Sequence, residues 1–320
     1  SCDFVGLATP GVQGLTPYVP GKPIAELERE LGIRNIIKLA SNENPLGPSA
    51  QVLSALDAVK ADLTRYPDGN GFLLKQALSA KLGVGADTIT LGNGSNDVLD
   101  LIARAFLSPG DEAVFSQYAF AVYPISTQAC GATAVVTPAR DWGHDLPAMA
   151  AAITAKTKVV FIANPNNPTG TMISEAEVAR LADGIPEDAI LVLDGAYAEY
   201  VEGFDAGASL IEARENVVMT RTFSKIYGLG GARVGWGYGP KPIIDVLNRV
   251  RGPFNVSVTA LAGAEAASAD DDRASGSAVT QSLAARIRAV RERKSQAGDG
   301  APPPPKAPER ATRGKAKAGG

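Results

Sequence analysis

Between residues 88 and 222 the sequence repeats one pattern, in which a short, continuous apolar run is followed by a segment with helical spacing. Continuous apolar runs are typical of strands buried on both faces, and strands that alternate with helices form a mostly parallel sheet with helices on each side. The pattern therefore predicts an α/β fold with a mostly parallel central sheet. The runs that carry this prediction are 88–91, 113–115, 158–163, 189–193 and 217–220.

Polar or charged side chains follow four of these runs. In an open parallel sheet, ligands bind beyond the carboxyl ends of the strands. We therefore expect the side chains in these four places to line one site, and this coincidence constrains the function more than any single motif does. They are Ser95 and Asn96 after the run 88–91, Asn167 after 158–163, Asp194 after 189–193 and Lys225 after 217–220.

Lys225 lies in the stretch Thr222-Phe-Ser-Lys-Ile-Tyr-Gly-Leu-Gly-Gly-Ala-Arg233. A lysine that is partly buried or close to another cation can lose its proton and form a Schiff base. The hydroxyls of Thr222 and Ser224 and the guanidinium of Arg233 are groups that bind a phosphate. Taken alone, the stretch is equally consistent with a surface lysine beside a flexible loop. The residues at the other strand ends must therefore distinguish between a Schiff-base lysine and a surface lysine.

Asp194 follows five apolar residues, where a carboxylate is costly unless it has a cationic partner. One kind of ligand accounts for this carboxylate, a lysine and a phosphate site together: a pyridine ring that carries an aldehyde, a phenolic oxygen and a phosphate. The lysine would join the aldehyde, the carboxylate would keep the ring nitrogen protonated, and Asn167 and Tyr197 would hold the phenolic oxygen. The segment 92–96 opens a helix and so suits the phosphate, but it lacks the glycine spacing of a dinucleotide site.

Composition sets outer limits on the function. At 320 residues and 45% hydrophobic content the chain can bury a large core, and its net charge of −3 gives no indication of nucleic acid or an anionic membrane as a partner. Two distant cysteines and a single histidine exclude a disulfide framework and a multi-histidine metal site. We interpret that histidine, His144, as structural, before a helix capped by Asp145. No secretory signal or apolar run of membrane length is visible, so we expect a cytoplasmic protein.

Three motifs in the second half of the sequence give a resemblance to a known family. They are Asn-Pro-Asn-Asn-Pro-Thr-Gly at 164–170, Leu-Asp-x-Ala-Tyr at 193–197 and Thr-x-Ser-Lys-x-x-x-Leu-x-x-x-Arg-x-Gly at 222–235. In this order and spacing, the chain resembles pyridoxal-phosphate-dependent aminotransferases of fold type I. Its N-terminal half is similar to histidinol-phosphate aminotransferases, and the whole likeness covers residues 5–268. The segments that carry the second likeness are 15–23, 38–48 and 65–69.

The resemblance implies how pyridoxal 5'-phosphate would be held. Lys225 would form a Schiff base with the cofactor and later move the proton between the substrate carbon and the cofactor carbon. Asp194 would pair with the ring nitrogen, and Asn167 and Tyr197 would hold the phenolic oxygen. The residues implied to bind the phosphate are Ser95, Asn96, Thr222, Ser224 and Arg233.

The resemblance also implies contacts to the cofactor ring, to a second subunit and to the substrate. Phe120 would stack on the ring, since its spacing to Gly131 favours it over Tyr118. Tyr66 would reach the phosphate of the neighbouring subunit's cofactor, which implies a homodimer with shared active sites. The residues implied to face the substrate are Tyr18 and Asn44, with Asn255 as a further candidate near it.

The activity implied by the resemblance is a transamination in histidine biosynthesis. It converts histidinol phosphate and 2-oxoglutarate to imidazole acetol phosphate and glutamate. An aminotransferase for aromatic or other amino acids is a second interpretation. A truncated, catalytically impaired relative of these enzymes is a third, because of the way the chain ends.

The C-terminus departs from the family pattern. Family members continue after a linker helix into a small domain whose last strand supplies an arginine for the substrate carboxylate, and no such strand follows Ala269. We therefore expect the small C-terminal domain to be largely absent, through truncation or a change of reading frame. The expected divisions are an N-terminal arm and helix at 1–35, a large cofactor-binding domain at 36–250, a linker helix at 251–269 and a mostly disordered, basic and Pro-rich tail at 270–320.

Overall fold

The computed structural model describes residues 2–270. The chain divides into two units, Ser1–Val279 and Thr280–Gly320, and every described residue belongs to the first of them. The tail expected at 270–320 lies outside the described residues, apart from Asp270. The expectation about that tail therefore stays a prediction.

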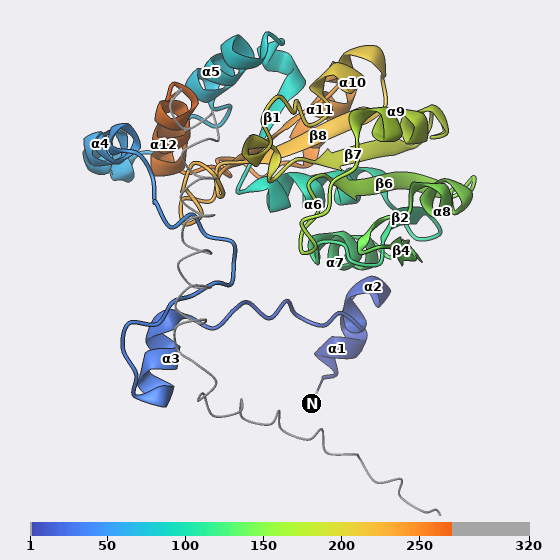
Figure 1. The fold of residues 1–320 in the computed structure, drawn as a ribbon, viewed down its shortest axis with the longest axis horizontal. Helices are drawn as coiled ribbons and strands as arrows, with labels where there is room; N and C mark the ends of the chain where they lie inside the picture. Colours follow the sequence, from blue (N-terminus) through green and yellow to red (C-terminus); the bar gives the residue numbers. More distant parts are fainter. Residues whose placement is uncertain (1, 271–320) are drawn as a thin grey trace, which may run out of the picture. The chain divides into compact units, whose positions relative to one another are not determined.

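A seven-stranded sheet forms the centre of the described unit (Figure 1). Its strands are β1 (Ile89–Gly92), β2 (Glu112–Ser116), β3 (Thr133–Thr137), β6 (Thr157–Ala163), β7 (Ile190–Asp194), β8 (Val217–Thr222) and β9 (Gly235–Tyr238). They lie in the order β1-β9-β8-β7-β6-β2-β3, in which β9 is antiparallel to both of its neighbours and the other pairs are parallel. The predicted α/β fold with a mostly parallel sheet is confirmed. A separate ribbon pairs β4 (Ala139–Arg140) with β5 (Gly143–His144).

Side chains of the inner strands alternate between two apolar cores. In β7, Leu191 and Leu193 belong to one core, and Ile190 and Val192 belong to the other. All four side chains are buried. Because successive side chains of a strand point to opposite faces, this division means that the sheet is buried on both sides.

Helices cover both faces of the sheet, as continuous apolar strands require. One face packs against α6 (Ser95–Phe106), α7 (Val122–Ala129) and α11 (Lys241–Val250). The opposite face packs against α8 (Leu146–Ala151), α9 (Glu175–Asp183) and α10 (Ala208–Ala213). Figure 1 shows α6 and α7 on one side of the strands and α9 and α10 on the other. The first turn of α6 and the carboxyl ends of β6, β7 and β8 meet at one edge of this arrangement, where the candidate site lies.

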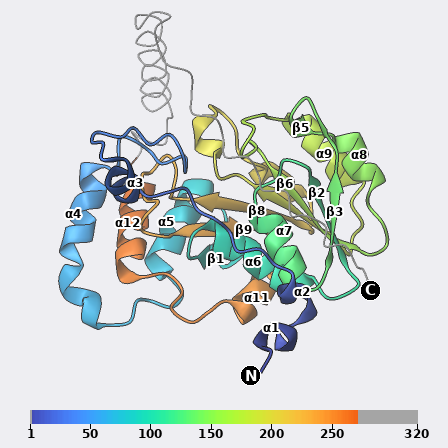
Figure 2. The same cartoon turned by 90° about the horizontal axis from the view of Figure 1, so that it is seen from below.

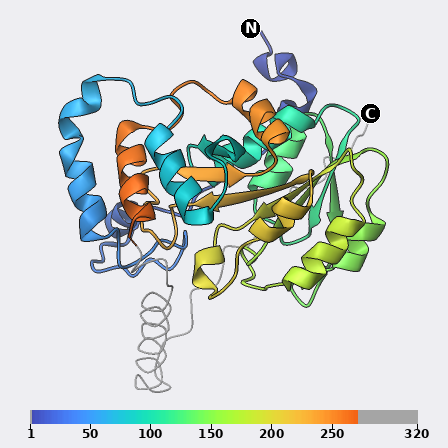
Figure 3. The same ribbon diagram turned by 90° about the horizontal axis from the view of Figure 1, so that it is seen from above.

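Three further helices lie side by side next to the β1 end of the sheet (Figures 2 and 3). They are α4 (Ala50–Ala58), α5 (Phe72–Leu82) and α12 (Val258–Ser268), and α12 packs against the other two. Their buried side chains, among them Val52, Leu74 and Ala264, join one of the two cores. Helix α12 thus lies within the range 251–269, where a linker helix was expected, while its role as a linker stays a prediction.

Local start and stop signals account for the helix boundaries. Helix α3 (Ile24–Leu31) ends at Gly32 and α5 ends at Gly83, and both glycines have the left-handed φ that favours glycine at a helix end. Ser174 and Glu177 form a capping box at the start of α9. The remaining short elements are α1 (Phe4–Leu7), α2 (Pro10–Gln13) and the 3₁₀ turns η1 (Lys60–Thr64), η2 (Ala86–Thr88) and η3 (Ala198–Tyr200).

His144 has a structural position in the fold. Its side chain is buried, and its Nε2 atom donates a hydrogen bond of 2.8 Å to the carbonyl oxygen of Ala163 at the end of β6. Burial lowers the pKa of the imidazole, so the ring is neutral at neutral pH. The next residue, Asp145, caps α8 by accepting a hydrogen bond from the backbone nitrogen of Ala148, as predicted.

Candidate active site

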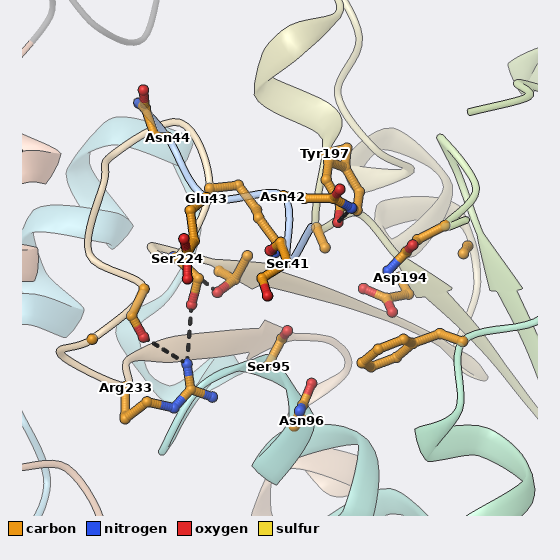
Figure 4. Close-up of a pocket in the computed structure, with 18 of the residues that line it drawn as sticks. Ser41, Asn42, Glu43, Asn44, Ser95, Asn96, Asp194, Tyr197, Ser224 and Arg233 are labelled. Atoms are coloured by element: carbon orange, nitrogen blue, oxygen red, sulfur yellow. Dashed lines mark hydrogen bonds between the residues drawn. The ribbon is translucent and has the colours of Figure 1, made fainter. Parts of the chain in front are cut away.

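A cavity of about 620 Å³ lies beside the carboxyl ends of the central strands (Figure 4). All of the predicted site residues except Tyr66 and the further candidate Asn255 line it, although they are spread between residues 18 and 233. The sheet explains the convergence, because parallel strands end at the same edge. The predicted residues in the cavity are Tyr18, Asn44, Ser95, Asn96, Phe120, Asn167, Asp194, Tyr197, Thr222, Ser224, Lys225 and Arg233.

Asp194 is the last residue of β7 and is only 5% exposed. Its Oδ2 atom accepts a hydrogen bond of 2.8 Å from the hydroxyl of Tyr123, and its Oδ1 atom accepts one of 3.1 Å from Thr220. Burial raises the pKa of the carboxyl, and these hydrogen bonds oppose the rise. The charge of Lys225 also opposes it but is the weakest of these influences. A carboxylate in this setting is suited to a cationic partner in the cavity.

Lys225 lies three residues beyond the end of β8. Its Nζ atom donates a hydrogen bond of 3.2 Å to the carbonyl oxygen of Ser41 and lies 5.5 Å from the centre of the Tyr197 ring. Burial lowers the pKa of the amine, the charge of Arg233 lowers it further, and Glu43 and Asp194 oppose the change. The environment therefore increases the fraction of neutral, nucleophilic amine at a given pH.

Tyr197 has a partner that the sequence did not identify. The side-chain nitrogen of Asn42 donates a hydrogen bond of 2.8 Å to the Tyr197 hydroxyl, and both residues line the cavity (Figure 4). Asn42 and the preceding Ser41 both have left-handed backbone conformations, with φ of 51° and 71°. Consecutive residues of this kind are uncommon outside glycine and are often found at functional sites. Asn42 lies in the polar segment 38–48, where the sequence predicts only Asn44 as a site residue.

Hydroxyl and guanidinium groups gather at the other end of the cavity. Arg233 Nη1 donates to Ser224 Oγ at 3.3 Å, a hydrogen bond drawn as a dashed line in Figure 4, and to the carbonyl of Gly230 at 3.0 Å. The hydroxyl of Thr222 accepts a hydrogen bond of 3.1 Å from the backbone nitrogen of Ser224. Ser95 begins α6, whose first backbone N–H groups have no helical acceptor. Hydroxyls, a guanidinium and a helix N-terminus are groups of the kind that bind a phosphate dianion.

Gly94 allows Arg233 to reach this end of the cavity. Its φ of 83°, with ψ of 164°, is a conformation that favours glycine. A Cβ atom at this position would lie 2.2 Å from Nη2 of Arg233, well inside van der Waals contact. The glycine before α6 is therefore required both by the turn and by the guanidinium that packs against it.

The aromatic candidates occupy different places. Phe120 lines the cavity, whereas Tyr118 does not and instead packs on Trp142 with a ring-centre distance of 5.1 Å. Tyr66 is 83% exposed, stacks on Phe254 at 4.8 Å and lies outside the cavity. Tyr66 therefore contributes nothing to the site of its own chain, and its predicted contact to a second subunit stays a prediction.

Two predicted asparagines have hydrogen bonds within the protein. Asn44 lines the cavity, but its amide donates to the carbonyl of Ile226 at 2.7 Å and accepts from the backbone nitrogen of Leu46 at 2.9 Å. In Figure 4 its side chain points away from the other labelled residues. Asn255 is not among the cavity residues; its amide donates to Leu91 and to Asp97. Both side chains hold loops in place in this structure.

Residues 2–270 contain neither a candidate metal site nor a membrane-spanning helix. No group of three or more His, Cys, Asp or Glu side chains in this range is placed to hold a metal ion. No helix in the same range has the length and apolar character needed to cross a membrane.

Comparisons with known proteins agree with this geometry. A family model described as aminotransferase class I and II matches residues 34–299. Histidinol-phosphate aminotransferase 2 of Pseudomonas fluorescens is 58% identical over 276 residues, which are 85% of this chain and 75% of that protein. A histidinol-phosphate aminotransferase of a Ruegeria species is 59% identical over 263 residues, which are 82% of this chain and 71% of that protein.

Solved structures give the same assignment. The histidinol-phosphate aminotransferase of Sinorhizobium meliloti, determined in complex with pyridoxal-5'-phosphate, aligns with a TM-score of 0.81 and 31% sequence identity. The alignment covers 91% of this chain and 78% of that chain. The fold is therefore the α/β fold of the fold type I aminotransferases. This chain belongs to the class I and II aminotransferase family, and within it to the histidinol-phosphate aminotransferases.

Proposed function

We propose that this chain is a pyridoxal-phosphate-dependent transaminase that acts on histidinol phosphate and 2-oxoglutarate. The observation that carries the proposal is the convergence of a lysine with a lowered pKa, a buried carboxylate and a phosphate-type site in one cavity. The relatives named above support the substrate, since they are histidinol-phosphate aminotransferases over most of this chain's length.

The residues in the cavity fit pyridoxal phosphate. Burial of Asp194 without a strong cationic neighbour suits a protonated ring nitrogen. At the other end, the guanidinium of Arg233 and the start of α6 suit the phosphate group. Asn167, Tyr197 and Phe120 lie in the same cavity, where they would hold the phenolic oxygen and one face of the ring. The remaining phosphate ligands would be Ser95, Asn96, Thr222 and Ser224.

The chain's own residues supply positioning and proton transfer. When bound, pyridoxal phosphate supplies an aldehyde that joins amines and a ring that withdraws electrons from the substrate carbon. Lys225 would provide the amine that holds the cofactor, and its Nζ atom, once released, would be the base that removes the proton from the substrate carbon. Asp194 would keep a proton on the ring nitrogen. Tyr197 would donate its hydroxyl proton to the phenolic oxygen.

The assembly and the chain divisions belong to the same proposal. Tyr66 would reach the cofactor phosphate of a second subunit, as the family resemblance implies. Its exposure outside the cavity of its own chain leaves the ring accessible for such a contact. We place the cofactor-binding domain at residues 36–250 and the linker helix at 251–269, in a cytoplasmic homodimer. Tyr18 would face the substrate from the N-terminal arm, and so would Asn44 if its two hydrogen bonds are exchanged for substrate contacts.

A labelling experiment followed by turnover measurements tests the proposal. The protein is incubated with pyridoxal phosphate, reduced with borohydride and digested, and the modified peptide is located by mass spectrometry. We expect the label on Lys225 and none in a Lys225→Ala variant. Glutamate formation from 2-oxoglutarate is then compared with histidinol phosphate, phenylalanine and tyrosine as amino donors.

Three outcomes of that experiment would contradict the proposal in different ways. Absence of the label from the unaltered protein would exclude the cofactor assignment. Labelled protein that is faster with an aromatic donor would replace the proposed substrate. Labelled protein without turnover on any donor would favour the catalytically impaired relative.

A further inference from the structure

Tyr123 contacts the candidate site from the protein interior. It lies in α7, is 1% exposed and is not among the residues that line the cavity. Its hydroxyl nevertheless donates a hydrogen bond of 2.8 Å to Oδ2 of Asp194. A phenol has one proton to donate, and in Tyr123 that proton is directed at this carboxylate.

Aromatic packing fixes the direction of that hydroxyl. The Tyr123 ring stacks on Phe161 of β6, with centroids 4.7 Å apart and an interplanar angle of 5°. It also meets the edge of Phe120 at 6.1 Å, and its backbone nitrogen donates to the Phe120 carbonyl at 3.1 Å. Rings packed this closely cannot turn without opening a void in the core. One side chain thus supports both Phe120, which lines the cavity, and the carboxylate of Asp194.

The electrostatics of the pair favour a stable donor. Burial raises the pKa of Asp194, and the hydrogen bond from Tyr123 is the first influence that opposes the rise, followed by that from Thr220. Burial and the neighbouring Asp194 carboxylate raise the pKa of Tyr123 well above its ordinary value. The phenol therefore remains protonated, and remains a donor, throughout the pH range in which the protein would work.

We propose that Tyr123 is a positioning residue whose hydroxyl keeps the Asp194 carboxylate ionised and oriented toward the ring nitrogen of pyridoxal phosphate. This inference rests on the proposed function, because the carboxylate contacts a ring nitrogen only if that cofactor binds. Tyr123 itself does not touch the cofactor and acts through Asp194. Its removal should therefore affect ligands that have a basic ring nitrogen and spare those that lack one.

Ligand binding to the full chain tests this prediction. The dissociation constants of pyridoxal phosphate, and of an analogue with C–H in place of the ring nitrogen, are measured by fluorescence titration for the unaltered protein and for Tyr123→Phe. We expect Tyr123→Phe to bind pyridoxal phosphate about tenfold more weakly, as for loss of a hydrogen bond to a charged group. Its affinity for the analogue should stay close to that of the unaltered protein. Thermal unfolding is recorded in parallel to show that the variant is folded.

A matched control and a second variant complete the test. Tyr238 is also buried and donates its hydroxyl to a carboxylate, that of Glu212, but it lies outside the cavity, so Tyr238→Phe should leave both dissociation constants unchanged. If Tyr123→Phe does not fold, Thr220→Val removes the other hydroxyl from Asp194 and should weaken pyridoxal phosphate selectively.

Two results overturn the inference. The first is an unchanged affinity of Tyr123→Phe for pyridoxal phosphate. The second is an equal loss of affinity for pyridoxal phosphate and for the analogue, since a purely structural role of Tyr123 would not depend on the ring nitrogen. Either result, with normal labelling of Lys225 in the unaltered protein, leaves the proposed function standing. Failure of the unaltered protein to bind pyridoxal phosphate overturns both proposals.

Discussion

The side-chain amide of Asn42 donates a hydrogen bond of 2.8 Å to the hydroxyl oxygen of Tyr197, which lies 155 residues later in the chain. A phenolic hydroxyl has one proton and also accepts through its oxygen. Because Asn42 occupies the acceptor position, the proton of Tyr197 is free to be donated to a ligand in the cavity. The N-terminal loop thereby orients the hydroxyl of Tyr197, which follows the end of β7 by three residues.

Replacing Asn42 should weaken cofactor binding through Tyr197. We expect Asn42→Ala to lower the affinity for pyridoxal phosphate by about 1 kcal/mol, the usual value of one hydrogen bond. Asn42→Asp should be worse than Asn42→Ala, since a carboxylate would accept the Tyr197 proton instead of freeing it. Fluorescence titration measures both, and in a Tyr197→Phe background the two substitutions should become equivalent. If the losses of affinity caused by the Asn42 and Tyr197 substitutions were additive in the double variants, Asn42 would not act through Tyr197.

Asp194→Asn should stabilise the cofactor-free protein and weaken cofactor binding. The pKa of Asp194 is raised from 3.8 in the folded state, so the folded protein holds this proton more tightly than the unfolded chain does. The associated stability is complete below pH 3.8 and is lost as the pH rises through the folded pKa. A neutral amide avoids this loss, so the variant should unfold at a higher temperature than the unaltered protein at pH 7.

The pH dependence separates this explanation from a simple packing effect. Thermal unfolding of cofactor-free samples should show the difference between Asp194→Asn and the unaltered protein shrinking toward acid pH. A constant difference at every pH would mean that ionisation of Asp194 is not its cause.

Gly94→Ala should impair the phosphate end of the cavity. The added Cβ would collide with Nη2 of Arg233, so the guanidinium must move. We expect at least a tenfold loss of affinity for pyridoxal phosphate, about 1.4 kcal/mol, and little change for pyridoxal, which has no phosphate. Gly110→Ala is a matched control, because Gly110 also has a positive φ but open space around its Cβ position. Equal effects of the two substitutions would point to backbone strain alone.

Arg221 should matter for stability rather than for binding. It forms a 2.8 Å ion pair with Glu199, with side chains 12% and 6% exposed, and neither residue lines the cavity. Removing one partner leaves a buried charge, so Arg221→Met should lower the free energy of unfolding by about 3 kcal/mol. Lys241→Met, which breaks the exposed pair with Asp245, should cost less than about 1 kcal/mol. Urea unfolding measures the free energy of unfolding of both variants. Similar losses in Arg221→Met and Lys241→Met would contradict the prediction that the buried pair matters more.

Much of the fold and of the cavity could be predicted because the informative residues adjoin strands. Asp194 ends β7 directly, and Lys225 follows β8 by three residues, so recognising the apolar runs was enough to bring them together. The motif 222–235 also supplied Arg233, whose position depends on the tight turn at Gly94. In these places, local sequence and strand topology determine the geometry.

The remaining contacts of the site depend on tertiary packing, which no local sequence pattern indicates. Tyr123 lies in a helix without a motif, and its contact with Asp194 joins residues 71 positions apart. Asn42 and Asn44 belong to one polar segment, and only the left-handed turn at Ser41 and Asn42 determines which amide reaches Tyr197. The sequence alone does not distinguish Asn42 from Asn44 as the partner of Tyr197, and only the tertiary structure does.

The distance along the chain between the two halves of the cavity has a consequence for its assembly. Asn44 is held by the carbonyl of Ile226, a separation of 182 residues. At the usual speed of translation, residues 18–44 leave the ribosome on the order of ten seconds before their partners in residues 194–233 are made. The segment synthesised first is thus among the last to reach its final contacts. Until then the cavity of a nascent chain lacks the side chains of residues 194–233. Cofactor binding can therefore begin only after these residues are made and residues 18–44 pack against them.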